Sequence, residues 1–180
     1  MLQLIKIDPS NYFQMDLLYR FRCDIGNWKS GYLTECLLRG MKPLTQGTLS
    51  DFEFFKAIHA QERPGDLPSC EYILCDKGTP VTLINAISGS GRVDLTVTTL
   101  PKFQRKGYAT AAIHMVEKDI FADLNNLFTT ITDITTEKIS SKIAAKLGYV
   151  YYEKTGIYIK GNPHINFEEE LKKTKQKRKK

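Results

Sequence analysis

The stretch F-Q-R-K-G-Y-A-T-A-A-I, residues 103–113, places two basic side chains and a glycine directly before a run that predicts a helix. The first turn of such a helix directs unpaired backbone N–H groups outward at the positive end of the helix dipole. Gly107 has no side chain, so an anion can approach its main chain closely. This combination is typical of a phosphate cradle. The alternative is a basic loop in which Gly107 serves only local packing, and the segment by itself leaves both readings open.

The residues on either side of this turn predict a strand before it and a helix after it. Residues 93–98 alternate in character, with Asp94 in phase with two threonines and opposite three apolar residues. The helix is expected from about residue 106 to 122. Its apolar residues follow the spacing i, i+3, i+4, i+7, i+11, and they are Ala109, Ala112, Ile113, Val116 and Ile120. His114 falls on the polar side beside Glu117 and Lys118, and we expect it to face solvent.

Other common nucleotide and metal motifs do not fit. Gly89-Ser90-Gly91 begins like G-x-G-x-x-G, but Asp94 stands where the third glycine belongs, and the segment joins two predicted strands. The chain contains no G-x-x-x-x-G-K-[ST] sequence, which leaves a P-loop unsupported. Its four cysteines form no C-x-x-C pair and have no histidine at metal spacing. We therefore expect free, mostly buried thiols and no metal.

The remaining segments predict a mixed α/β (α+β) fold. An edge strand is expected at 2–7, three strands of an antiparallel meander at 71–76, 81–88 and 92–99, and further strands at 127–133, 149–154 and 157–160. Helices are expected at 12–23, 31–38, 51–60, 106–122 and 137–147, the first with its turn and cap in Asp8-Pro9-Ser10. This order predicts one domain over residues 1–167, with a mostly antiparallel twisted sheet flanked by helices.

The net charge of +6 is concentrated at the C-terminus. Residues 168–180 contain three glutamates and seven lysines or arginines, so that most of the chain is nearly neutral. We interpret this segment as a solvated, disordered tail, and weak contact with nucleic acid or ribosomes through nonspecific charge attraction remains an alternative. Charged residues interrupt the apolar positions of the first thirty residues, which predicts neither a signal peptide nor a membrane span and favours a soluble, cytoplasmic protein.

Two segments in order resemble motifs of the GNAT acyltransferase superfamily. Motif A is a strand ending in Val followed by [QR]-x-x-G-x-[GA], and here Leu95-Thr96-Val97 is followed by Gln104-Arg105-Lys106-Gly107-Tyr108-Ala109. Motif B ends a helix with K-L-G-[FY], and here the segment S-S-K-I-A-A-K-L-G-Y covers residues 140–149. The resemblance extends over about residues 71–160 and is closest to the branch with ribosomal-protein acetyltransferases, which also contains enzymes for small amines.

This resemblance implies an N-acetyltransferase that uses acetyl-CoA and an amine acceptor. The pyrophosphate would lie on the backbone amides of Arg105, Lys106, Gly107, Tyr108, Ala109 and Thr110, next to Gln104. The pantetheine arm would pair with Leu95, Thr96 and Val97, with the Val97 N–H donating to the thioester oxygen as it becomes an oxyanion. The same resemblance leaves a coenzyme-binding module without catalysis as an alternative, and a homodimer stays open.

The acid and base of the reaction are harder to assign. Many family members place a tyrosine two residues before the lysine of K-L-G-[FY] as proton donor to the thiolate, and Ala144 stands there in this chain. Ser140, one helical turn earlier, matches a serine that part of the family places near the sulfur. A base is needed because an alkylamine with a pKa of about 10.4 must lose a proton before it attacks. Asp94 and Asp133 are the carboxylates nearest the expected thioester, and Asp94 is the first candidate for this role. Further candidates, each with an ordinary packing role as alternative, are Glu71, Tyr151, Tyr152 and Tyr158.

Overall fold

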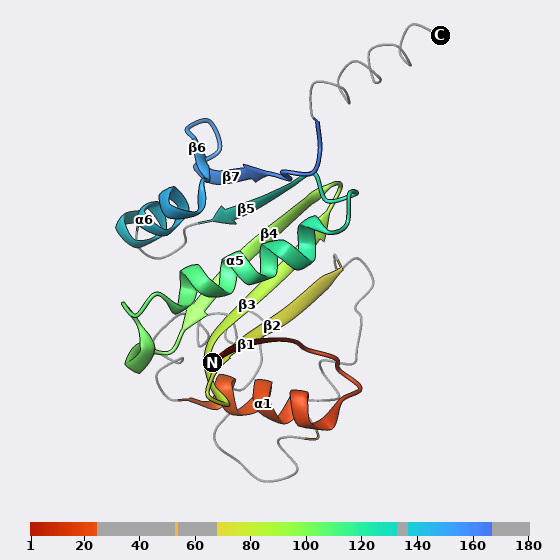
Figure 1. Ribbon diagram of the computed structural model, residues 1–180, viewed down its shortest axis with the longest axis vertical. Coiled ribbons are helices and arrows are strands. Elements are labelled where there is room, and N and C mark those ends of the chain that lie inside the picture. The colour runs from red at the N-terminus through yellow and green to blue at the C-terminus, as the bar shows by residue number, and fades with distance from the viewer. Residues whose placement is uncertain (25–52, 54–67, 133–136, 167–180) are drawn as a thin grey trace, which may run out of the picture.

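The computed structural model describes residues 1–24, 53, 68–132 and 137–166, and side chains at 132 and 137–140 are outside this description. The elements follow the chain in the order shown in Figure 1. They are β1 (Leu2–Lys6), α1 (Tyr12–Cys23), β2 (Ser69–Asp76), β3 (Thr79–Gly89), β4 (Arg92–Thr99), the 3-10 turn η2 (Pro101–Phe103), α5 (Tyr108–Phe121), β5 (Phe128–Thr132), α6 (Glu137–Leu147), β6 (Val150–Tyr152) and β7 (Ile157–Gly161).

These elements confirm the predicted order of strands and helices, with small differences at their ends. One difference concerns the start of α1, whose cap is Asn11 and not the preceding Asp8-Pro9-Ser10. The Asn11 side chain accepts a hydrogen bond from the Gln14 N–H at 3.2 Å. Asp8 accepts one from the Ser10 N–H at 2.8 Å and so closes a separate turn before the helix. The predicted helices at 31–38 and 51–60, apart from residue 53, and the tail at 168–180 lie outside the described residues.

Seven strands form one sheet in the order β1-β2-β3-β4-β5-β7-β6. Neighbouring strands are antiparallel except β4 and β5, which are parallel. This mixed, mostly antiparallel sheet confirms the predicted fold class. The parallel pair is short, since only Arg92–Leu95 of β4 pairs with Phe128–Ile131 of β5. Beyond this point the two strands diverge, as Figure 1 shows to the left of α5.

Each face of the sheet carries its own apolar core, because successive residues of a strand point to opposite faces. On one face, α5 packs its buried stripe against β2, β3 and β4, in a cluster that includes Leu74, Leu95 and Val116. On the other face, α1 packs against a second cluster that includes Leu18, Ile73 and Leu83. In β4, Val93 and Leu95 point to the α5 face, which leaves Asp94 and Thr96 on the α1 face.

Several smaller predictions can be compared with the described residues. Cys23, Cys70 and Cys75 are free thiols, and Cys23 and Cys75 are buried. Among the described residues, no group of His, Cys, Asp and Glu side chains is arranged to hold a metal ion. No described helix combines the length and the apolar character needed to cross a membrane.

Candidate functional site

The turn before α5 has an unusual backbone. Arg105 and Gly107 have positive φ angles, 62° and 84°, and Gly107 is the residue that caps the helix. No side chain caps this end of α5, and the N–H groups of its first turn, up to the Ala111 N–H that bonds Gly107, have no acceptor within the helix. A Cβ placed on Gly107 would meet no atom within 4 Å, so it would project into open space. The turn therefore presents backbone donors to a space that can hold an anion.

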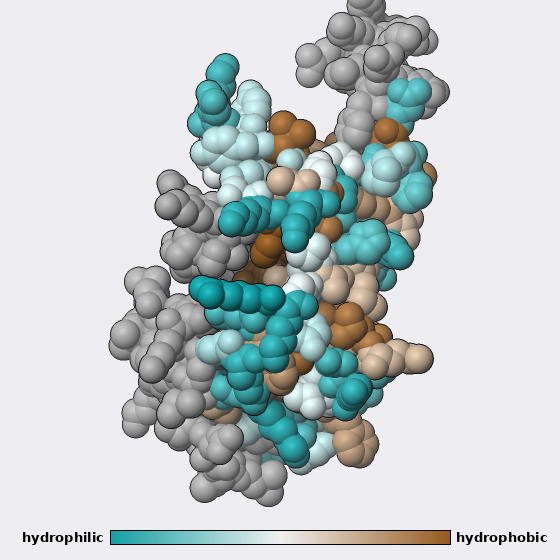
Figure 2. Space-filling model, turned by 60° about the vertical axis from the view of Figure 1, so that its left-hand side comes forward, coloured by the Kyte–Doolittle hydropathy of each residue, from teal (hydrophilic) through white to brown (hydrophobic). Residues whose placement is uncertain are grey.

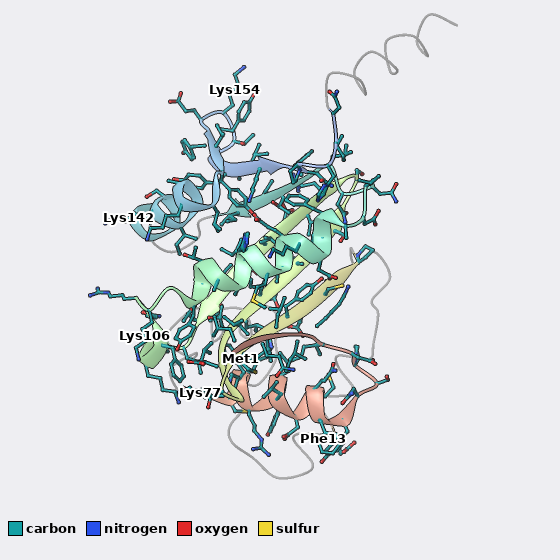
Figure 3. The ribbon with its side chains drawn as sticks, in the orientation of Figure 1. Met1, Phe13, Lys77, Lys106, Lys142 and Lys154 are labelled. Carbon is teal, nitrogen blue, oxygen red and sulfur yellow. The ribbon has the colours of Figure 1, made fainter. Side chains whose placement is uncertain are left out.

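The basic side chains of this turn lie at its outer side. Gln104, Arg105 and Lys106 are exposed, and the Gln104 amide donates to the Thr99 carbonyl at 3.2 Å. The Lys106 ammonium lies 5.6 Å from the centroid of the Phe103 ring. Figure 3 labels Lys106 in the turn before the start of α5 and Lys142 on α6, on the same side of the molecule. Lys106 is thus engaged with an aromatic face while the backbone amides stay available.

Tyr108 fixes this turn to the end of β2. Its hydroxyl donates a hydrogen bond to Asp76 Oδ2 at 2.6 Å, and its ring packs edge-on against Phe103 with centroids 6.0 Å apart. The hydrogen bond to Asp76, followed by burial, raises the pKa of the Tyr108 phenol. The sequence analysis did not identify Asp76 as a residue of this site, because Tyr108, its hydrogen-bond partner, is 32 residues away in the chain. The first residue of α5 is therefore held in place through its side chain, and its N–H remains directed into the turn.

The backbone of β4 becomes open directly before this turn. Thr96–Thr99 pair with β3 on one side, and on the other side the described β5 residues pair only as far as Leu95. Leu95 is 1% exposed and Val97 packs against the same core, as the sequence predicts. Their side chains are used for packing, so only the backbone of this edge is available for a ligand. Figure 2, which looks at this side of the molecule, shows apolar surface (brown) between bands of hydrophilic side chains (teal).

Asp94 lies at the last paired positions of β4 and β5, on the α1 face. Its Oδ1 accepts a hydrogen bond from Thr130 Oγ1, and its Oδ2 lies 2.8 Å from Arg92 Nη2. Each carboxylate oxygen thus has one protein partner and keeps a further lone pair that can accept from an amine. Glu71, another candidate base, forms an ion pair with Arg22. The base role of either carboxylate stays a prediction.

Helix α6 places Ser140 and Ala144 on one side. The side chain of Ser140 lies outside the described part, so its predicted contact with a sulfur stays a prediction. Ala144 is fully buried in the core beneath α5 and α6. Asp133 lies outside the described residues.

A buried charged pair joins α5 to β7, and the sequence analysis missed it. Glu117 is 3% exposed, although it was placed on the polar side of its helix with His114, which is exposed as predicted. Its Oε2 lies 2.6 Å from Lys160 Nζ. The Tyr149 hydroxyl shares a hydrogen bond of 2.9 Å with Thr129 Oγ1, and burial, followed by the charge of Glu117, raises the pKa of Tyr149. The sequence contained one indication that Glu117 is buried. It follows Ile113 by four residues, so it lies beside the apolar stripe of the helix.

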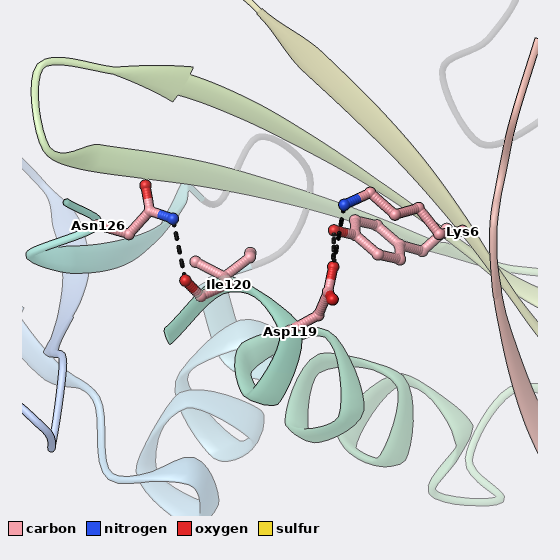
Figure 4. A network of polar contacts seen from close by, with 5 residues as sticks. Lys6, Asp119, Ile120 and Asn126 are labelled. Atoms are coloured by element: carbon pink, nitrogen blue, oxygen red, sulfur yellow. Dashed lines mark hydrogen bonds and ion pairs between the residues drawn. The ribbon is translucent and has the colours of Figure 1, made fainter. Parts of the chain in front are cut away.

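A second polar network anchors the C-terminal half of α5 to the opposite edge of the sheet (Figure 4). Asp119 Oδ2 accepts hydrogen bonds from Tyr72 Oη at 2.6 Å and from Lys6 Nζ at 3.2 Å. The hydrogen bond from Tyr72, with a smaller effect of Lys6, lowers the pKa of Asp119. Near the end of the helix, the Asn126 side chain donates to the Ile120 carbonyl at 2.9 Å. These contacts hold α5 rigidly over β1 and β2, which fixes where its N-terminal turn points.

Comparisons with known proteins identify the fold. No protein-family model matches the sequence, and no curated protein matches it either. Among solved structures, an acetyltransferase of the GNAT family from Streptococcus pneumoniae has a TM-score of 0.55 at 13% identity, over 88% of this chain and 96% of that one. The ribosomal-protein-S18-alanine N-acetyltransferase from Escherichia coli has a TM-score of 0.55 at 12% identity, over 92% and 97%.

A third solved structure, the spermidine N-acetyltransferase from Vibrio cholerae in complex with CoA and spermine, has a TM-score of 0.57 at 14% identity, over 84% of this chain and 82% of that one. At such low sequence identities, these comparisons show only a similar arrangement of strands and helices. The chain has the fold of the GNAT N-acetyltransferases.

Proposed function

We propose that this protein transfers an acetyl group from acetyl-CoA to a primary amine of a protein or a small molecule. The observation that carries the proposal is the open edge of β4 leading directly into the positive-φ turn at the N-terminus of α5. An extended ligand with a diphosphate at one end fits both features at once. Bound acetyl-CoA supplies the thioester carbon that an amine attacks, and coenzyme A leaves as a thiolate.

The residues of the chain divide into binding and orienting roles. The N–H groups from Arg105 to Thr110 hold the diphosphate at the helix end, where the dipole favours negative charge. The open backbone of Thr96 and Val97 orients the pantetheine arm, and the Val97 N–H donates to the thioester oxygen as negative charge develops there. The amine enters from the α1 face, where Asp94 is the preferred base.

Two of the structural neighbours bear on the acceptor class. One is the ribosomal-protein-S18-alanine N-acetyltransferase, and the other is the spermidine N-acetyltransferase in complex with CoA and spermine. On the α1 face of this chain, Glu71 and Asp94 are both paired with arginines. Polyamine sites depend on unpaired carboxylates, because several ammonium groups must be neutralised. This pairing favours an acceptor with one amine over a polyamine, as the N-terminus of a peptide would be.

A second candidate function is a coenzyme-binding module without turnover. It is favoured by the burial of Ala144, where an alanine offers no proton donor, and by the engagement of both Asp94 oxygens. This candidate has the same coenzyme site as the proposed enzyme, but it does not transfer the acetyl group.

One experiment separates the two candidates. Calorimetry with acetyl-CoA tests the shared site, and a thiol-release assay over a panel of N-terminal peptides, lysine peptides and polyamines tests transfer. The enzyme is expected to bind the coenzyme and to release thiol with at least one peptide amine. Binding without release over the whole panel would support the module, and absence of binding would contradict both.

A further inference from the structure

A thioester that is attacked by an amine releases a thiolate, and a nearby hydroxyl group assists this step by donating a proton. Helix α6 offers Ala144 at the position facing the core, and this residue is fully buried among apolar side chains. A donor for the thiolate must therefore come from another element. Tyrosine is a suitable donor, because its hydroxyl stays protonated at neutral pH.

Most tyrosine hydroxyls of the described part are already committed or lie elsewhere. The hydroxyls of three half-buried or buried tyrosines are hydrogen-bonded to protein partners: Tyr72 to Asp119, Tyr108 to Asp76 and Tyr149 to Thr129. Tyr12 and Tyr19 belong to α1, on the other face of the sheet. Tyr151 and Tyr152 are about half exposed on the edge strand β6.

Tyr158 differs from all of these. It is partly buried, and its ring packs against the core formed beneath α5 and α6. Within the described part of the chain, its hydroxyl has no hydrogen-bond partner, and it is not among the fully buried unsatisfied groups. The hydroxyl is thus reachable from outside the protein and available to a ligand.

The register of the sheet places Tyr158 at the point where β4 and β5 separate. Leu95 of β4 pairs with Ile131 of β5, and Ile131 pairs with Tyr158 of β7. Directly paired residues point to the same face, so all three side chains lie on the α5 face in one row. Neighbouring strands are about 4.8 Å apart, so the Tyr158 backbone is about 10 Å from that of Leu95. Tyr158 therefore lies on the α5 face, in the same row as the last paired residue of β4, which is where the opening begins.

We propose that the Tyr158 hydroxyl donates the proton to the leaving sulfur of coenzyme A. This inference rests on the proposed function and names a catalytic residue for it. As the new C–N bond forms, the C–S bond breaks and its electron pair goes to sulfur, which takes the proton of Tyr158. The tyrosinate is then reprotonated by the proton that the acceptor amine loses, through solvent.

Binding measurements test the contact without any turnover. Calorimetry compares coenzyme A with desulfo-coenzyme A, which lacks the sulfur, for the unmodified protein and for Tyr158→Phe. If the hydroxyl meets the sulfur, Tyr158→Phe lowers affinity for coenzyme A by about tenfold at a pH where the thiol is ionised, and it leaves affinity for desulfo-coenzyme A unchanged. The control is Tyr12→Phe, because Tyr12 is half exposed and lies on α1, on the other face of the sheet.

Turnover gives the second readout. Tyr158→Phe is expected to lower kcat by about a hundredfold with little change in KM for acetyl-CoA, while Tyr12→Phe stays close to the unmodified protein. An equal loss of affinity for both coenzyme forms, or an unchanged kcat in Tyr158→Phe, overturns the assignment of Tyr158 and leaves the acetyltransferase intact. If the unmodified protein binds neither coenzyme form, the proposed function fails, and the role of Tyr158 falls with it.

Discussion

Substitution of Gly107 is expected to weaken coenzyme binding far more than removal of a neighbouring positive charge. Gly107 has a φ of 84°, and a Cβ there would project into open space. A side chain at this position therefore meets no protein atom in the free protein, but it occupies the space from which an anion approaches the helix end. Gly107→Val removes the close approach, and with it the helix-end interaction and one or two charged hydrogen bonds, together about 3 kcal/mol. This corresponds to a Kd about a hundredfold higher.

Lys106→Ala provides the comparison on the same turn. Lys106 is exposed, and its ammonium lies over the Phe103 ring. Exposed charges contribute little, so we expect at most about a fivefold weaker Kd. The assay is calorimetry with coenzyme A at fixed salt concentration. The phosphate-cradle reasoning is refuted if Lys106→Ala raises Kd more than Gly107→Val does while both proteins are folded.

A matched glycine separates backbone strain from ligand contact. Gly148 follows α6, has a φ of 79° and likewise has no atom within 4 Å of its Cβ position. Replacing either glycine by alanine costs about 1–2 kcal/mol of folding free energy, because L-residues disfavour positive φ. Gly107→Ala and Gly148→Ala should therefore lose similar stability in urea unfolding. A loss of coenzyme affinity is expected for Gly107→Ala alone, and equal losses in both would assign the effect to strain.

Three further predictions concern the contacts that hold α5 in place. Lys160→Met should lower the free energy of unfolding by about 3 kcal/mol in urea titrations, because Glu117 is then buried without its partner. The double variant Lys160→Met with Glu117→Leu should recover most of this loss. The pKa of Asp119 is lowered in the folded state, so its contribution to the free energy of unfolding is present above about pH 4 and is lost below it. In urea unfolding, Asp119→Asn should therefore lower this free energy by up to about 1 kcal/mol at pH 7 and should have no effect at pH 2. Tyr108→Phe removes the hydrogen bond to Asp76 and should raise KM for acetyl-CoA several-fold. The KM for acetyl-pantetheine, which lacks the diphosphate, should stay unchanged. An equal rise of both KM values would show a general structural effect.

Local patterns in the sequence were sufficient for most of the fold. The apolar stripe of α5 and the alternation in β4 predicted which residues are buried, because both follow from the period of a single element. The turn at Gly107 was predicted for the same reason, since glycine, basic residues and a helix start are adjacent in the chain. The cap of α1 was misplaced because two side chains near its start, Asp8 and Asn11, are both good turn or cap residues, and each closes its own turn.

What could not be predicted depends on pairs that are distant in the chain. Glu117 is charged, and periodicity alone assigns a charged residue to solvent; its burial depends on Lys160, 43 residues away. The engagement of Asp94 depends on Thr130, which only the register of the parallel strands brings to it. Tyr158 was one of several equivalent tyrosines in the sequence. The register of the sheet distinguishes it, because it places Tyr158 in one row with Ile131 and Leu95.

The open edge of β4 also bears on how this protein avoids self-association. Unpaired strand edges are templates for strands of other molecules, and proteins limit them by keeping edge strands short. Here the two outer strands of the sheet, β1 and β6, have five and three residues. The stretch Thr96–Thr99 of β4, which no described residue of β5 pairs with, lies in the middle of the sheet, between β3 and the diverging β5. A strand from a second chain would need room between β4 and β5 to lie along it, so the position of this stretch inside the sheet limits pairing with another molecule.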